Sequence, residues 1–119
     1  MFSFLLISKF ILFRQSPAIL PTPAKRLKRS SKRIAGRFEA VECGSDFEVY
    51  VDFAHTPDAL EKILKEVRGM TDKRMITVFS CNGDRDRTKR GEMGRIACEL
   101  SDVPIVTMGS ARSESPHKI

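Results

Sequence analysis

The sequence has few cysteines and no long apolar run, and both absences narrow the class of protein. Its three cysteines are an odd number and include no Cys-x-x-Cys pair, which disfavours a disulfide framework and a cysteine-based zinc site. No apolar run reaches the roughly 18 residues that span a bilayer, so no membrane span is expected. With 119 residues, of which 41% are hydrophobic and 30% charged, the chain suits one globular domain.

Acidic residues are absent from the first 38 positions, although the chain has 15 of them. The same segment holds nine of the 21 lysines and arginines, which gives it a net charge of +9. Residues 39–119 hold twelve bases against 15 acids, a net charge of −3. The pattern predicts a basic, hydrophobic leader over residues 1–35 and a mildly acidic domain over residues 36–119.

The leader begins with an apolar stretch that Lys9 interrupts, and three prolines follow between residues 15 and 23. Residues 25–33 then hold six bases. The functional interpretation is a patch for RNA or an anionic membrane, or a targeting segment such as a transit peptide, and the alternative is a poorly ordered arm or foreign sequence joined by gene truncation. No aromatic side chain interleaves with these bases, so no specific nucleic-acid partner is expected.

Strand and helix patterns alternate in the rest of the chain. Residues 48–53, 75–79 and 103–108 are β-branched or aromatic runs typical of strands. Thr56 and Pro57 form a helix start, the apolar spacing continues to Val67, and Gly69 is expected to end that helix. A second helix is expected over residues 92–101. This alternation predicts an α/β fold with a Rossmann-like parallel sheet.

Polar residues gather after each predicted strand, at 52–58, 80–90 and 109–116. Parallel sheets bind ligands at the carboxyl ends of their strands, so we expect a site where these segments meet. The bases of residues 85–90 are either a solvated face or a clamp for a carboxylate or phosphate. His55 is a base, a nucleotide contact or a residue that hydrogen-bonds at the helix start. Cys81 has no catalytic partners in the sequence and is interpreted as packing.

Two kinds of ligand site fail on spacing. Neither GxxxxGK[ST] nor GxGxxG occurs, so the chain does not hold nucleotide phosphates by those loops. Asn82, Asp84 and Asp86 alternate as in a calcium loop, but its sixth position is Arg87 instead of glycine and its twelfth is Met93 instead of glutamate. No metal site is therefore predicted.

Four segments of the domain resemble the signatures of the Mur ligase family, in the same order. Residues 36–39 (G-R-F-E) are similar to G-R-[FM]-E, and residues 51–60 (V-D-F-A-H-T-P-D-A-L) to V-D-Y-A-H-T-P-D-A-L. Residues 79–90 (F-S-C-N-G-D-R-D-R-T-K-R) resemble F-G-C-G-G-D-R-D-x-x-K-R, and residues 106–116 resemble V-T-S-D-N-P-R-x-E-x-P. The resemblance covers residues 36–119 and favours the branch that adds diaminopimelate or lysine to UDP-N-acetylmuramoyl-L-alanyl-D-glutamate in peptidoglycan precursor synthesis.

The resemblance implies the partial C-terminal domain of a three-domain ligase. In such an enzyme ATP, with magnesium, phosphorylates the substrate carboxylate, and the amine of the incoming amino acid attacks the acyl phosphate. Because the sequence has no P-loop motif, we expect this chain alone to be inactive, to contribute no catalytic residue, and to bind neither ATP nor magnesium tightly.

The resemblance also implies two sets of binding residues. Arg37, Asp52 and His55 align with residues that contact ATP. Arg85 aligns with a residue that binds the carboxylate of the amino acid, a role that suits a planar guanidinium. The amino-acid specificity loop of the family aligns with Gly109, Ser110, Ala111 and Arg112.

Several residues depart from the family's motifs. The D-N-P-R motif keeps only Arg112, so the side chains that would grip the far end of the amino acid are missing. Ser80 and Asn82 replace glycines, and Gly91 replaces a proline. These changes leave the identity of the amino acid open.

Three other interpretations of the chain remain open. The first is a non-catalytic binding module or remnant, which captures an amino acid or a nucleotide or docks on a complete ligase. The second is a basic targeting arm joined to an inert domain. The third is a fragment similar to folylpolyglutamate synthase. The expected compartment is the cytoplasm, or a plastid if the leader is a transit peptide.

Overall fold

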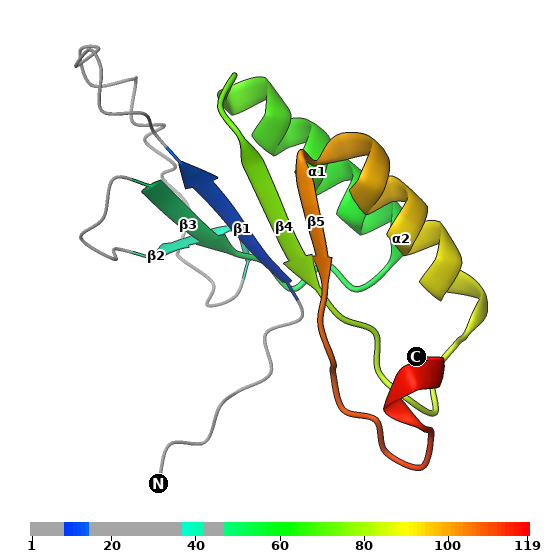
Figure 1. The fold of residues 1–119 in the computed structure, drawn as a ribbon. Helices are drawn as coiled ribbons and strands as arrows, with labels where there is room; N and C mark the ends of the chain where they lie inside the picture. The colour runs from blue at the N-terminus through cyan, green and yellow to red at the C-terminus, as the bar shows by residue number, and fades with distance from the viewer. Residues whose placement is uncertain (1–8, 15–36, 42–46) are drawn as a thin grey trace, which may run out of the picture.

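The computed structural model describes residues 9–14, 37–41 and 47–119 (Figure 1). The α/β class is confirmed, while the basic run of residues 25–33 lies outside the described residues. The strands are β1 Lys9–Arg14, β2 Glu39–Val41, β3 Phe47–Val51, β4 Met75–Phe79 and β5 Val103–Val106. The helices are α1 Pro57–Met70, α2 Thr88–Leu100 and the short 3-10 helix η1 Pro116–Lys118.

The five strands form one sheet in the order β2-β3-β1-β4-β5. The expected parallel pairing occurs between β4 and β5, where Phe79 lies opposite Val106. β1 runs antiparallel to both β3 and β4, and β2 runs antiparallel to β3, so the sheet is mixed. β1 belongs to the segment that the sequence assigned to the leader. Part of that segment therefore lies in the sheet, between β3 and β4.

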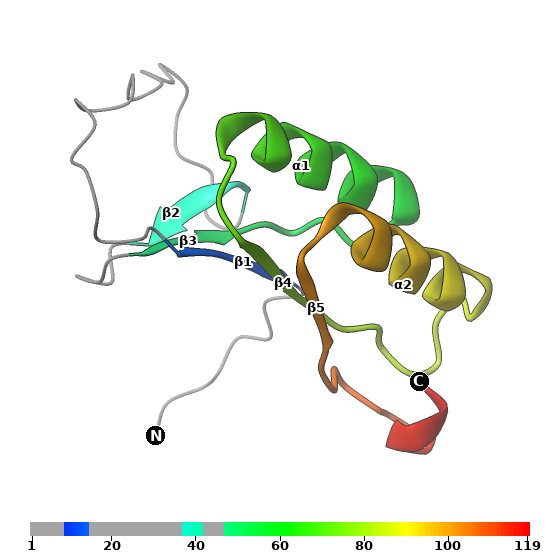
Figure 2. The same cartoon turned by 45° about the horizontal axis from the view of Figure 1, so that its top comes forward.

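Both α-helices lie side by side on one face of the sheet, as Figures 1 and 2 show. This arrangement follows from two crossovers of the same hand that step in the same direction across the sheet. The core lies between the helices and the sheet, and its buried side chains include those predicted from the helical spacing. Its fully buried larger members are Leu60, Leu64, Val67, Met75, Phe79 and Met93, together with Thr77.

The first helix starts as predicted and ends later. The hydroxyl of Thr56 accepts a hydrogen bond from the amide of Ala59 (3.3 Å), and Pro57 follows as the first helical residue. The expectation that Gly69 ends the helix was wrong, because α1 continues to Met70 and Thr71 is its cap. The helix ends where the chain returns to extended backbone at Thr71, without a left-handed glycine.

Aspartate side chains set two other boundaries. Asp52 accepts a hydrogen bond from the amide of Ala54 (2.7 Å), and β3 ends at Val51, two residues before the predicted end. Asp86 accepts from both the amide and the hydroxyl of Thr88 at 2.9 and 2.6 Å, so α2 begins at Thr88. The predicted loop over residues 80–90 is therefore shorter, and Arg90 lies in the first turn of a helix.

Candidate functional site

The loop after β4 and the segment after β5 form one unit at the carboxyl ends of these strands. The amide of Thr107 donates to the carbonyl of Phe79, and the amide of Gly83 donates to the carbonyl of Ser110, both at 2.8 Å. A side chain on Gly83 would collide with the carbonyl of Ala111, so glycine is required there. The sequence prediction that these two segments meet is therefore confirmed.

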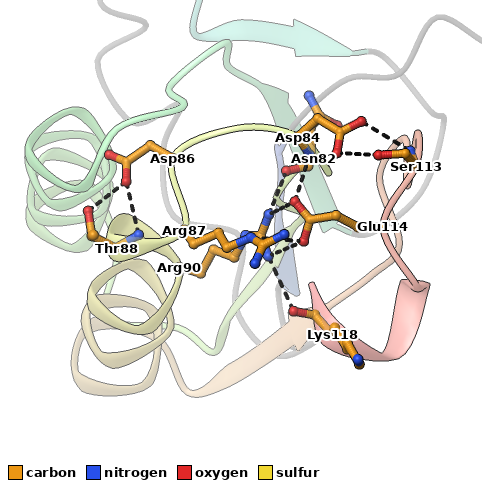
Figure 3. Close-up of polar contacts among 9 residues, drawn as sticks. All are labelled: Asn82, Asp84, Asp86, Arg87, Thr88, Arg90, Ser113, Glu114 and Lys118. Atoms are coloured by element: carbon orange, nitrogen blue, oxygen red, sulfur yellow. Dashed lines mark hydrogen bonds and ion pairs between the residues drawn. The ribbon is translucent and has the colours of Figure 1, made fainter.

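A buried ion pair between Arg90 and Glu114 joins the first turn of α2 to the segment after β5 (Figure 3). Arg90 donates from both terminal nitrogens to the two carboxylate oxygens of Glu114, each at 2.9 Å. The two side chains are only 10% and 7% exposed. Arg90 also donates to the carbonyls of Asn82 and Lys118, each at 3.2 Å, and the amide of Asp84 donates to Glu114 at 2.7 Å. These bonds replace most of the water that the two charges lose on burial, while Nε of Arg90 is buried without a hydrogen-bond partner among the described residues.

The surroundings of Glu114 and Asp84, two of the carboxylates in this unit, favour their ionised forms. Hydrogen bonding from Arg90 lowers the pKa of Glu114 to about 2, against the opposing effect of its burial, with help from the amide of Asp84 and the nearby charge of Arg87. Asp84 accepts from the hydroxyl and the amide of Ser113 at 2.6 and 3.1 Å, and these bonds lower its pKa as well. The loop is therefore held by fixed negative charges.

Acid should weaken this unit over a defined pH range. The pKa of Glu114 falls from its ordinary 4.5 to about 2 on folding, so its contribution to stability is complete above pH 4.5 and is lost as the pH falls toward 2. Urea denaturation at several pH values measures this loss. Because other carboxylates also titrate, the comparison is with Glu114→Gln, whose stability should change less across this window. Identical slopes for the two proteins would contradict the assignment.

The predicted amino-acid-binding residues lie on the two joined segments. Arg85 and Arg112 are both exposed, and neither makes a hydrogen bond or ion pair within the described part of the chain. Arg112 has a left-handed backbone, with φ of 51°, which costs free energy and persists only where the surrounding structure holds it. Of the other three predicted residues, Gly109 is buried, Ser110 is exposed and Ala111 is half-buried.

The predicted nucleotide-binding residues lie around β2 and the end of β3. Arg37 is exposed directly before β2. Both carboxylate oxygens of Asp52 accept backbone hydrogen bonds, one from Phe38 at 2.9 Å and one from Ala54 at 2.7 Å. Asp52 therefore joins the start of β2 to the loop after β3. Phe38 has a positive φ of 46°, which this bond helps to hold.

His55 lies next to this group and is linked to the second helix. Its exposed ring has Nδ1 3.1 Å from the carbonyl oxygen of Phe53. Its own carbonyl accepts a hydrogen bond from the ammonium of Lys89 at 3.0 Å. The loop after β3 and the first turn of α2 are thus connected, which brings both predicted sets of residues to one end of the molecule.

Comparison with known proteins identifies the family. The model of the family "Mur ligase, glutamate ligase domain" matches residues 36–119. The chain belongs to this family. Three similar relatives all carry the name UDP-N-acetylmuramoyl-L-alanyl-D-glutamate–2,6-diaminopimelate ligase. The chain is 57% identical to that of Syntrophomonas wolfei over 86 residues, 52% to that of Fusobacterium nucleatum over 96, and 47% to that of Clostridium perfringens over 104.

The Mur ligase relatives are much longer than this chain. The matches cover 72%, 78% and 84% of this chain but 18%, 20% and 22% of the respective relatives. The chain therefore spans about a fifth of their length, and it corresponds to one domain of the Mur ligase family.

Sequence reasoning missed the residues that hold the Mur ligase loops together. Glu114 lies in the motif of residues 106–116, and Arg90 ends the motif of residues 79–90, so both were visible. Their pairing was not, because 24 residues separate them. Among the described residues, no cluster of three His, Cys, Asp or Glu side chains is placed to hold a metal ion, and no helix is long and apolar enough to cross a membrane.

Proposed function

We propose that residues 36–119 are the amino-acid-binding part of an ATP-dependent ligase that adds diaminopimelate to UDP-N-acetylmuramoyl-L-alanyl-D-glutamate. The observation that carries this proposal is the pair of exposed guanidiniums, Arg85 and Arg112, on two segments that are bonded together at one sheet edge. The names of the relatives support diaminopimelate over lysine and the peptidoglycan branch over folylpolyglutamate synthesis.

The two guanidiniums suit the carboxylates of the amino acid. Each presents a planar fork of N–H donors, so each pairs with a carboxylate in a fixed orientation. Fixing the carboxylate would aim the amine at an acyl phosphate and reduce the entropy lost in the reaction. Gly109, Ser110 and Ala111 would complete the pocket, but they offer only backbone groups and one hydroxyl.

ATP would meet the other set of residues. Arg37 has an exposed guanidinium suited to a phosphate oxygen, and His55 has an exposed ring. Asp52 already accepts two backbone bonds, so its proposed contact with ATP uses the remaining lone pairs of the carboxylate. ATP supplies the phosphoryl group when it is bound. Since no phosphate-loop motif occurs in these 119 residues, we expect no ligase turnover from this polypeptide alone.

Binding of diaminopimelate to the chain tests the amino-acid site. We expect a dissociation constant that is millimolar or weaker, because two exposed charge-assisted contacts barely exceed the free-energy cost of association, about 4 kcal/mol or more. NMR titration should show weaker binding to Arg85→Ala and Arg112→Ala. Arg74→Ala is the control, because this exposed arginine directly precedes β4, at the opposite end of that strand. Equal affinity in all four proteins would refute the residue assignment.

We also propose a cytoplasmic location, as expected for a ligase that uses a UDP-linked precursor. The comparisons give no support to the plastid alternative, since the three relatives named above are bacterial. Fractionation of the host cells would test the location.

A further inference from the structure

Three departures from the family's motifs meet at one point of the structure. Ser80 and Asn82 stand where the motif of residues 79–90 has glycines, and Gly109 stands where the D-N-P-R motif has aspartate. A Cβ atom on Gly109 would lie 2.7 Å from Oδ1 of Asn82 and 3.1 Å from Oγ of Ser80, with the carbonyl oxygen of Cys81 at 2.8 Å. The side chains of Ser80 and Asn82, which the family's motif lacks, therefore occupy the space beside Gly109, where the motif has a side chain.

The side chain of Asn82 also makes a bond in this space. Its Oδ1 accepts a hydrogen bond from the amide of Ser110 at 3.1 Å, while the carbonyl of Ser110 accepts one from Gly83. Both backbone groups of Ser110 are therefore held by the loop after β4. An aspartate at position 109 has no room, because the backbone carbonyl of Cys81 blocks its Cβ atom together with the side chains of Asn82 and Ser80.

The bond between Asn82 and Ser110 holds the chain before Arg112, and further bonds hold the chain after it. Ser113 is bonded to Asp84, and Glu114 to Arg90. The left-handed backbone of Arg112 is therefore enclosed between two anchored positions. The amide of Glu114 also donates to the carbonyl of Ala111 at 3.0 Å, which closes a turn around Arg112, and we expect loss of either anchor to let this turn shift and move the guanidinium.

We propose that Asn82 is a positioning residue for Arg112, because it anchors the segment Gly109–Arg112 from the neighbouring loop. Ser80 fills part of the space beside Gly109. The inference deepens the proposed function and rests on it, since Arg112 matters there as a carboxylate-binding group. The anchor itself is a property of the fold and can be measured without a ligand.

A mutant cycle on the 119-residue chain tests the anchor. NMR hydrogen exchange of the Ser110 amide should become at least about fivefold faster in Asn82→Gly, which removes the acceptor. Gly109→Asp alone should also speed exchange, because its side chain collides with Asn82, Ser80 and the backbone carbonyl of Cys81. The double variant N82G/G109D should not recover protection, because the Ser110 amide still lacks its acceptor and the carbonyl of Cys81 still blocks the new side chain. Asn82→Asp should retain protection, since Oδ1 remains. Unchanged exchange in Asn82→Gly, or recovered protection in the double variant, would overturn the proposal.

Diaminopimelate titration of the same variants tests the positioning of Arg112. Asn82→Gly should weaken binding about as much as Arg112→Ala, and the two together should weaken it no further, because both remove one interaction. Slower-exchanging amides in the α1 core serve as the control for global unfolding. Unchanged affinity in Asn82→Gly would overturn the positioning role. Failure of the unsubstituted chain to bind would refute the proposed function, and the exchange cycle would then decide the anchor by itself.

Discussion

A chain that lacks residues 1–14 is expected to lose its cooperative fold. β1 lies between β3 and β4 and has a five-residue register with each of them. Its removal leaves two strands with unpaired amides and carbonyls in the middle of the sheet, and each group that stays buried costs about 1–3 kcal/mol. A domain of this size has a stability of only roughly 0.05–0.15 kcal/mol per residue. Circular dichroism during heating should show no sharp transition.

Removal of residues 1–8 alone is the matched control, because it shortens the same end and leaves β1 in place. That protein should melt like the full chain. A third protein with proline at Ile11 and Phe13 would keep the length but remove two strand amides. If the chain without residues 1–14 melts as sharply and at the same temperature as the control, β3 and β4 pair without β1, and the central role of β1 is refuted.

Replacement of Leu64 by alanine is expected to destabilise the domain by about 2–5 kcal/mol. Leu64 is fully buried in the middle of α1 and belongs to the core cluster between the helices and the sheet. Its loss leaves a cavity that helices packed on one face can fill only by shifting against the strands. In such a small domain this is a large share of the total stability. Urea denaturation should show a lower midpoint, or no folded baseline at all.

Lys65→Ala is the control for the backbone effect of alanine. It lies at the next position of α1 but its side chain is exposed, and its ion pair with Glu61 is an ordinary helix-surface pair. Its stability should change by no more than about 0.5 kcal/mol. Equal losses for the two substitutions would show that the core does not pack around Leu64 as described.

The two α-helices and the strands β3, β4 and β5 were predictable because their signals are local, whereas β2 and η1 were not predicted. The spacing of Leu60, Ile63, Leu64 and Val67 fixes the buried side of α1, and β4 has the predicted bounds. Two of the boundaries that differed, the end of β3 and the start of α2, depend on side chains whose hydrogen-bond partners the pattern does not name. Asp52 ends β3 early and Asp86 starts α2 early by bonding to amides two residues further along the chain.

The candidate site was only partly predictable. Its exposed cations, Arg85 and Arg112, stood out because guanidiniums follow predicted strands and resemble family motifs. The residues that support them did not stand out. The sequence left the bases of residues 85–90 open between a solvated face and a clamp for a ligand, but Arg90 is nearly buried against Glu114, since the early start of α2 turns it inward.

The sequence by itself determined the α/β class, the order of helices and strands in residues 47–119, and the family, because periodicity and motifs are properties of neighbouring residues. Only the tertiary structure decided which strands are adjacent. It placed β1 between β3 and β4, since backbone pairing depends on groups far apart in the chain and not on local pattern. It also showed that Ser80, Asn82 and Gly109 share one space, because whether a side chain fits is decided by the packing around it.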